Sequence, residues 1–177
     1  MATRSNIALL VDGAYLTIYC HWDGYPDGVG QTLHDHYKTF DQVQNLILLG
    51  NLSSLGPTLG EKHDFDWATN FHQKHGYNTE KWSPEVKAEY DHYNAMCNAY
   101  GRDRGERGAG AVAYKSLAEV LRNGEEWLYV FDAADSTWYV ALVGHANDGQ
   151  PYKSDGYIFN TLVPFKDHET LVPSEDE

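Results

Sequence analysis

YCHWDGYPDGVG, residues 19–30, is the stretch at which a strand is expected to stop, a rigid corner to follow and a helix to begin. It joins three aromatic side chains, one imidazole, two carboxylates and three glycines within twelve positions. This composition suits a binding corner at least as well as a fold determinant. Pro26 disfavours helical backbone at Tyr25, and Asp27 is a candidate N-cap for a helix that runs through Leu33 towards Tyr37.

A β-hairpin is predicted before this corner. Residues 5–11 and 15–22 are apolar, β-favouring runs on either side of an Asp12-Gly13 pair, which is a strong hairpin signal. The second strand alternates between an apolar face and a polar, aromatic face. The apolar face carries Leu16, Ile18 and Cys20, and the other carries Tyr15, Thr17, Tyr19 and His21. Any ligand of this sheet would meet the second face.

The remaining elements are predicted from periodicity and capping residues. Helices are expected from about Asp41 to Gly50, after Ser83-Pro84, and after the capping box at 116–119. A second hairpin is expected over 127–131 and 137–143, and a strand over 157–163, whereas 51–60 has the composition of a loop. Together these predict one α+β domain over residues 1–177, with an antiparallel sheet built from hairpins and helices packed on one face. An irregular or helical insertion is expected at about 61–99 and a flexible acidic tail at 173–177.

Composition narrows the class of protein. The 177 residues include 42% hydrophobic residues, enough for a core without disulfides or a structural metal. Thirteen basic against 26 acidic residues give a net charge of −13, which opposes direct binding to nucleic acid or to an anionic membrane. This negative charge has two interpretations: it keeps the protein soluble, or it forms an acidic surface that imitates the phosphate backbone of DNA. Cys20 and Cys97 show no pairing motif and no long apolar run occurs, so a cytoplasmic protein is expected.

A second candidate site is the arginine and glycine segment at 101–110, the only concentration of arginine in the chain. Guanidinium groups bind phosphate bidentately, and glycines let backbone N–H groups approach an anion. The alternative is a mobile, solvated loop. The candidate ligand-binding residues of the corner and this segment are Tyr19, His21, Trp22, Asp23, Tyr25, Arg102, Arg104 and Arg107.

Catalysis and metal binding have weaker signals. Nine histidines occur without a recognised ligand spacing, and no metal or cofactor is expected. Cys20 and His21 are neighbours on a strand, so their side chains point to opposite faces and do not form a nucleophile and base pair. No catalytic residue is assigned, and a binding protein is favoured over an enzyme, although sequence leaves an enzyme open.

Several stretches resemble a family of small, uncharacterised proteins found in bacteriophages and bacterial genomes. They are TRSNIA at 3–8, IYCHWDGYP at 18–26, LSSLG at 52–56, GEKHDFD at 60–66 and YGRDRGE at 100–106. Residues 73–98 look like an insertion relative to shorter members. The resemblance implies a setting in which compact phage proteins counter host defence, and it supplies no catalytic residues.

The leading prediction is a non-enzymatic phage anti-defence protein that binds and sequesters a nucleotide-derived immune signal, of ADP-ribose type or a cyclic nucleotide. In this hypothesis Trp22, Tyr25 or Tyr19 stacks on the base, His21 and Asp23 make polar contacts, and the three arginines hold phosphates. One alternative is an acidic inhibitor or DNA mimic that blocks a host protein, and another is an enzyme that degrades such nucleotides. A homo-oligomer is compatible with each of these hypotheses.

Overall fold

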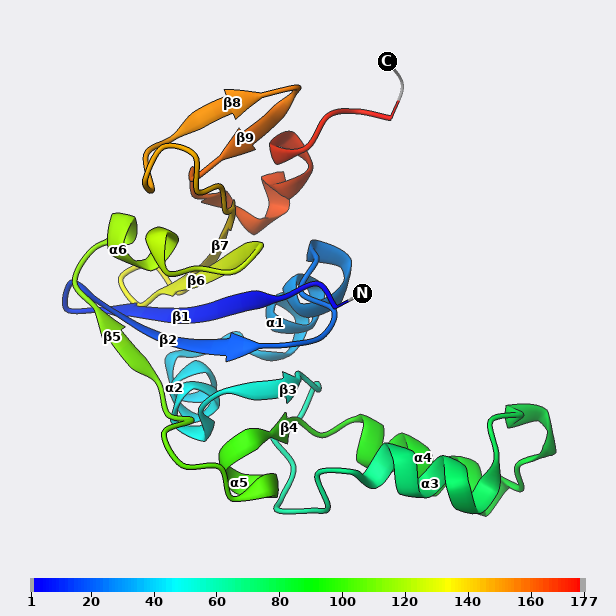
Figure 1. The fold of residues 1–177 in the computed structure, drawn as a ribbon. Helices are drawn as coiled ribbons and strands as arrows, with labels where there is room; N and C mark the ends of the chain where they lie inside the picture. Colours follow the sequence, from blue (N-terminus) through cyan, green and yellow to red (C-terminus); the bar gives the residue numbers. More distant parts are fainter. Residues whose placement is uncertain (1, 176–177) are drawn as a thin grey trace.

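A computed structural model describes residues 2–175 and contains the predicted first hairpin (Figure 1). Strands β1 (Ser5–Val11) and β2 (Ala14–Cys20) pair antiparallel. Asp12 and Gly13 both have positive φ, at 50° and 77°, as a two-residue turn of this kind requires. The expected alternation along β2 is also present, because Ile18 and Cys20 lie in the main hydrophobic cluster. The first hairpin is therefore confirmed.

The sheet is mixed, and the prediction of a purely antiparallel sheet is wrong. Among the described residues it has ten strands, with β5 beside β2, β10 beside β7 and the others in the order β4-β3-β2-β1-β6-β7-β9-β8. Beyond β1 and β2 the strands are β3 (Leu52–Ser54), β4 (Asn98–Ala99), β5 (Val112–Tyr114), β6 (Trp127–Asp132), β7 (Thr137–Leu142), β8 (Tyr152–Ser154), β9 (Tyr157–Phe159) and β10 (Val163–Pro164). Three pairs are parallel: β1 with β6, β2 with β3, and β7 with β9. Each parallel pair is joined by a long connection, which a pattern of adjacent hairpins does not reveal.

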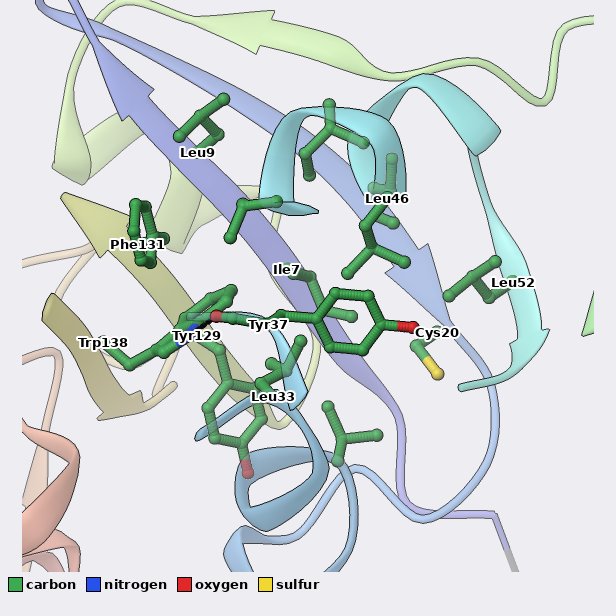
Figure 2. Packing of buried hydrophobic residues seen from close by; sticks show 14 of the residues in the cluster. Ile7, Leu9, Cys20, Leu33, Tyr37, Leu46, Leu52, Tyr129, Phe131 and Trp138 are labelled. Carbon is green, nitrogen blue, oxygen red and sulfur yellow. Dashed lines mark hydrogen bonds between the residues drawn. The ribbon is translucent and has the colours of Figure 1, made fainter. Parts of the chain in front are cut away.

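Helices cover both faces of the sheet, so the prediction that they pack on one face is wrong. One face carries the π-helix η1 (Pro26–Gly30), α1 (Gln31–His36), α2 (Phe40–Leu49) and the 3-10 helix η3 (Phe165–Leu171). Figure 2 shows Leu33 and Leu46 packed over Ile7 and Phe131 in this layer. The opposite face carries α6 (Leu117–Arg122), whose buried residues pack against Ala8 between Ile7 and Leu9 of β1.

Two predicted helix caps are confirmed, because Ser83 caps α4 (Pro84–Asn94) and the Ser116 hydroxyl accepts a hydrogen bond from the Glu119 amide at α6. The helix expected from about Asp41 is α2, and its capping box of Thr39 and Gln42 was not predicted. The predicted cap at Asp27 is wrong, because Pro26 already occupies the first helical position and Asp27 lies inside η1. The second predicted hairpin, β6 with β7, is present.

The segment between β3 and β4 extends away from the sheet as a pair of helices (Figure 1). Helix α3 (Trp67–His75) occurs where no periodicity was found, and it is followed by a short 3-10 helix, η2 (Thr79–Lys81), and α4. The contacts between α3 and α4 are largely aromatic, and Trp67 stacks on Tyr93 with ring centroids 5.6 Å apart. This pairing of aromatic rings explains a helix without a regular aliphatic stripe.

Past α4 the chain returns to the main core. Helix α4 ends at Asn94, and Cys97, three residues later, is buried in the main hydrophobic cluster. Helix α5 (Tyr100–Arg104) then contains the first part of the arginine segment. Residues 176 and 177 of the expected acidic tail lie outside the described residues. None of the described helices combines the length and the apolar character that a bilayer span requires.

Candidate functional site

The corner that follows β2 is held by backbone hydrogen bonds on both sides. The amides of His21 and Trp22 donate to carbonyls of β3, at 3.0 Å each, and the amide of Gly24 donates to the Thr3 carbonyl at 2.8 Å. Between them Asp23 has a φ of +57°, a left-handed conformation that is uncommon outside glycine. A non-glycine residue keeps this left-handed conformation only where the surrounding structure holds it there. Such residues cluster at functional sites.

Buried groups fix the corner from below. The hydroxyl of Tyr129, a residue only 1% exposed, donates to the Gly24 carbonyl at 2.7 Å. Neither glycine of this region has room for a side chain. A Cβ on Gly24 would lie 2.8 Å from the Thr3 oxygen, and one on Gly28 would lie 2.3 Å from the Asp23 oxygen. The corner backbone therefore has one tightly packed conformation.

This rigid backbone presents two large aromatic side chains to solvent. Trp22 is 47% exposed and Tyr25 is 43% exposed, so neither fills the core. The Tyr25 hydroxyl donates to the Asp23 carboxylate at 3.1 Å. That hydrogen bond raises the pKa of Tyr25 and keeps the phenol neutral. Exposed aromatic rings on a fixed backbone are typical of recognition surfaces.

The other candidate residues of the corner lie together on the polar face of β2. The Tyr19 hydroxyl and the His21 Nδ1 atom are 2.6 Å apart, and the His21 ring meets the Trp22 ring edge-on at 4.7 Å. Burial is the main cause that raises the pKa of Tyr19, so its phenol stays neutral at neutral pH, and either it or the His21 Nδ1–H can be the donor, according to the tautomer of His21. The Asn51 side chain accepts from the Tyr19 amide at 2.9 Å and links this face to the chain before β3.

A cavity of about 650 Å³ lies beside Tyr25. Its lining comes from three separated parts of the chain: Tyr25, Pro26 and Asp27 of the corner, Trp127 of β6, and His168, Glu169 and residues 172–175 near the C-terminal end. Sequence reasoning missed Trp127 and His168, because they lie about 100 and 140 positions from the corner and belong to no motif. From sequence, a tryptophan at the start of a strand is expected to be a packing residue, so Trp127 was not proposed as part of a site.

The arginine segment does not join this cavity. The Arg102 guanidinium donates to the carbonyls of Leu59 and Cys97, at 2.8 Å each, and to the Asp103 carboxylate at 2.9 Å. Burial alone would raise the pKa of Asp103, but hydrogen bonds, above all from Arg102, hold it below its usual value. The contacts of Arg102 are those of a structural residue.

The other two arginines lie on the surface. Arg104 lies over the rings of Phe65 and Tyr100, at 4.6 and 4.7 Å, and pairs with Glu106. Arg107 is exposed. Within the described chain, none of the three arginines lines the cavity beside Tyr25. The structure thus brings Tyr19, His21 and Trp22 together, and Asp23 with Tyr25, but leaves the arginines apart from the cavity.

The corner and the strands beside it are acidic. Residues 5–37 carry four aspartates and no lysine or arginine, with Arg4, whose backbone adjoins Gly24, just before them, and residues 123–152 carry five carboxylates and again no lysine or arginine. The local field therefore attracts cations and repels anions. The described residues contain no group of three or more histidine, cysteine, aspartate or glutamate side chains arranged to hold a metal ion. No protein-family model, curated protein or solved structure matches this chain.

Proposed function

We propose that this protein is a non-enzymatic inhibitor that occupies a positively charged surface of a host protein with its acidic, aromatic corner. The observation that carries the proposal is the exposure of Trp22 and Tyr25, at 47% and 43%, on a backbone that is fixed from both sides. In the phage setting that the sequence resemblance implies, the partner is a protein of the host defence.

Three physical arguments support this role. Aromatic side chains near the centre of an interface supply a large share of its binding energy. A corner that is already rigid loses little conformational entropy when the complex forms. A net charge of −13 accelerates encounter with a basic partner and opposes association with nucleic acid.

Sequestration of a nucleotide stays a prediction, and the positions of the arginines in the structure give it less support than their composition did. Phosphates need cations that face the ligand, and the guanidinium of Arg102 is already bonded to two carbonyls and a carboxylate. The aromatic surface beside Tyr25 is lined by carboxylates, which would repel phosphate. An inhibitor of a basic protein uses the same aromatic side chains without this conflict.

The test compares capture of host proteins by the wild type and by single-site variants. The immobilised protein is exposed to bacterial lysate, and captured proteins are identified by mass spectrometry and then purified. We expect a basic partner whose binding weakens at least tenfold in Trp22→Ala and Tyr25→Ala and falls steeply between 50 and 500 mM salt, on the order expected for screened charges. Tyr77→Ala is the matched control, because Tyr77 is 78% exposed and lies outside the corner.

Three outcomes would overturn the proposal. Capture that is equally strong in both corner variants would place the interface elsewhere. A nucleotide panel measured in parallel by thermal shift covers the other hypotheses. A large stabilisation that is lost in Trp22→Ala or Tyr25→Ala, with the nucleotide recovered intact, would support sequestration, whereas recovery of a converted nucleotide would identify an enzyme.

A further inference from the structure

We infer that the cavity beside Tyr25 binds an organic cation and that its preferred occupant is a guanidinium group. The binding of a guanidinium group does not depend on the proposed function. The further step, that this guanidinium belongs to an arginine of the partner protein, rests on it. The cavity itself is defined by Tyr25, Asp27, Trp127, His168 and Glu169, and is called the corner cavity below.

Two aromatic side chains from different elements line the corner cavity. Tyr25 precedes η1, and its ring is fixed at the far end by the hydrogen bond from its hydroxyl to Asp23. Trp127 begins β6 and packs partly against the main core, so it is a rigid part of the wall. Cations are attracted to the faces of tyrosine and tryptophan, and the planar guanidinium also stacks on them.

Most polar groups of the corner cavity are acceptors, although the Trp127 indole and the Ser174 hydroxyl of its lining can also donate. Asp27, Glu169 and Glu175 contribute exposed carboxylates. The His168 Nδ1 atom lies 2.9 Å from the Phe165 carbonyl and must donate to it, so the Nε2 atom of the neutral imidazole is an acceptor. The Tyr25 hydroxyl donates to Asp23, and no lysine or arginine of the described chain lines the cavity. A group rich in N–H donors is the complement of this set.

The dimensions and the remaining lining fit a long side chain. A volume of about 650 Å³ exceeds what a guanidinium alone fills, and it lies within the range of small-ligand sites, roughly 300–1,000 Å³. Pro26, Val172 and Pro173 add apolar surface to the lining. The methylene stem of an arginine can lie along such surface while its head reaches the carboxylates.

The test uses n-butylguanidinium as the probe and n-butylurea as its neutral isostere, with binding followed by NMR of the tryptophan indole N–H groups. We expect saturable shifts with n-butylguanidinium only. The double variant Asp27→Asn/Glu169→Gln should bind the probe at least tenfold more weakly. The matched control Glu80→Gln/Asp148→Asn removes the same charge at exposed residues outside the cavity and should bind as the wild type does.

Equal shifts with n-butylurea, or no loss of binding in the cavity variant relative to the control, would overturn the inference. Its failure is distinguishable from failure of the proposed function. If n-butylguanidinium does not bind while the basic partner is still captured through Trp22 and Tyr25, the cavity assignment is wrong and the inhibitor proposal stands. If the probe binds as expected and no partner is captured, the cation site stands without the proposed function.

Discussion

Replacing Tyr129 by phenylalanine removes the hydroxyl that holds the corner from below. The Tyr129 ring is 1% exposed, and its hydroxyl donates to the Gly24 carbonyl at 2.7 Å. The variant leaves this buried carbonyl without its donor, which costs roughly 1–3 kcal/mol of unfolding free energy. Burial raises the pKa of Tyr129 well above its usual value, so the hydroxyl stays a donor and the loss should be the same throughout the neutral pH range.

Urea unfolding followed by tryptophan fluorescence measures this loss, and a thermal melt gives a second reading of roughly 2–4 °C per kcal/mol for a domain of this size. Tyr25→Phe is the matched control. It also removes one phenolic hydrogen bond, but at an exposed position, where a change of no more than about 0.5 kcal/mol is expected. A loss in Tyr129→Phe no larger than that of the control would refute the argument that a buried hydrogen bond fixes the corner.

Four further predictions concern buried groups. Arg102→Ala leaves the buried Asp103 carboxylate with the Ala99 and His63 amides but without its arginine partner, and it should cost up to about 3–5 kcal/mol in urea unfolding. Because the pKa of Asp103 is lowered in the folded protein, its contribution is present at neutral pH and should fade as acid titration passes below the ordinary pKa of an aspartate, whereas a flat profile would contradict this. Gly24→Ala forces a Cβ to within 2.8 Å of the Thr3 oxygen and should lower the unfolding free energy measured with urea by roughly 1–3 kcal/mol. Burial raises the pKa of the Cys20 thiol to about 12, so its reaction with a disulfide reagent at neutral pH should be slow until the protein unfolds.

The parts of the fold that sequence predicts are those decided by neighbouring residues. The turn at Asp12 and Gly13 and the cap at Ser116 depend on chemistry within a few positions, and both are found where expected. The pairing of β1 with β6 joins residues 5–10 to 127–132 and has no local signal. The position of α6 on the second face has no local signal either.

In the candidate site, too, the features decided by neighbouring residues were predictable and those decided by tertiary contacts were not. The corner itself could be predicted from Gly24, Pro26 and Gly28, but sequence left open whether Trp22 and Tyr25 fill the core or face solvent, and the structure exposes both. The arginines were expected to face a ligand because of their composition, but a guanidinium binds a nearby carboxylate or carbonyl as readily as a phosphate. Arg102 finds Asp103 next to it and the Leu59 carbonyl across a loop. The corner cavity depends on tertiary contacts with Trp127 and His168.

The parallel pairing of β1 with β6 also affects folding during synthesis, because β6 is made long after β1. More than a hundred residues separate the end of β1 from the start of β6, and at roughly 5–20 residues per second the ribosome needs at least about 5 s to make them. During that time the first hairpin has an unpaired edge and an uncovered second face. A nascent chain or fragment that ends before Trp127 therefore exposes an apolar strand edge, so the protein depends on its second half for protection against aggregation.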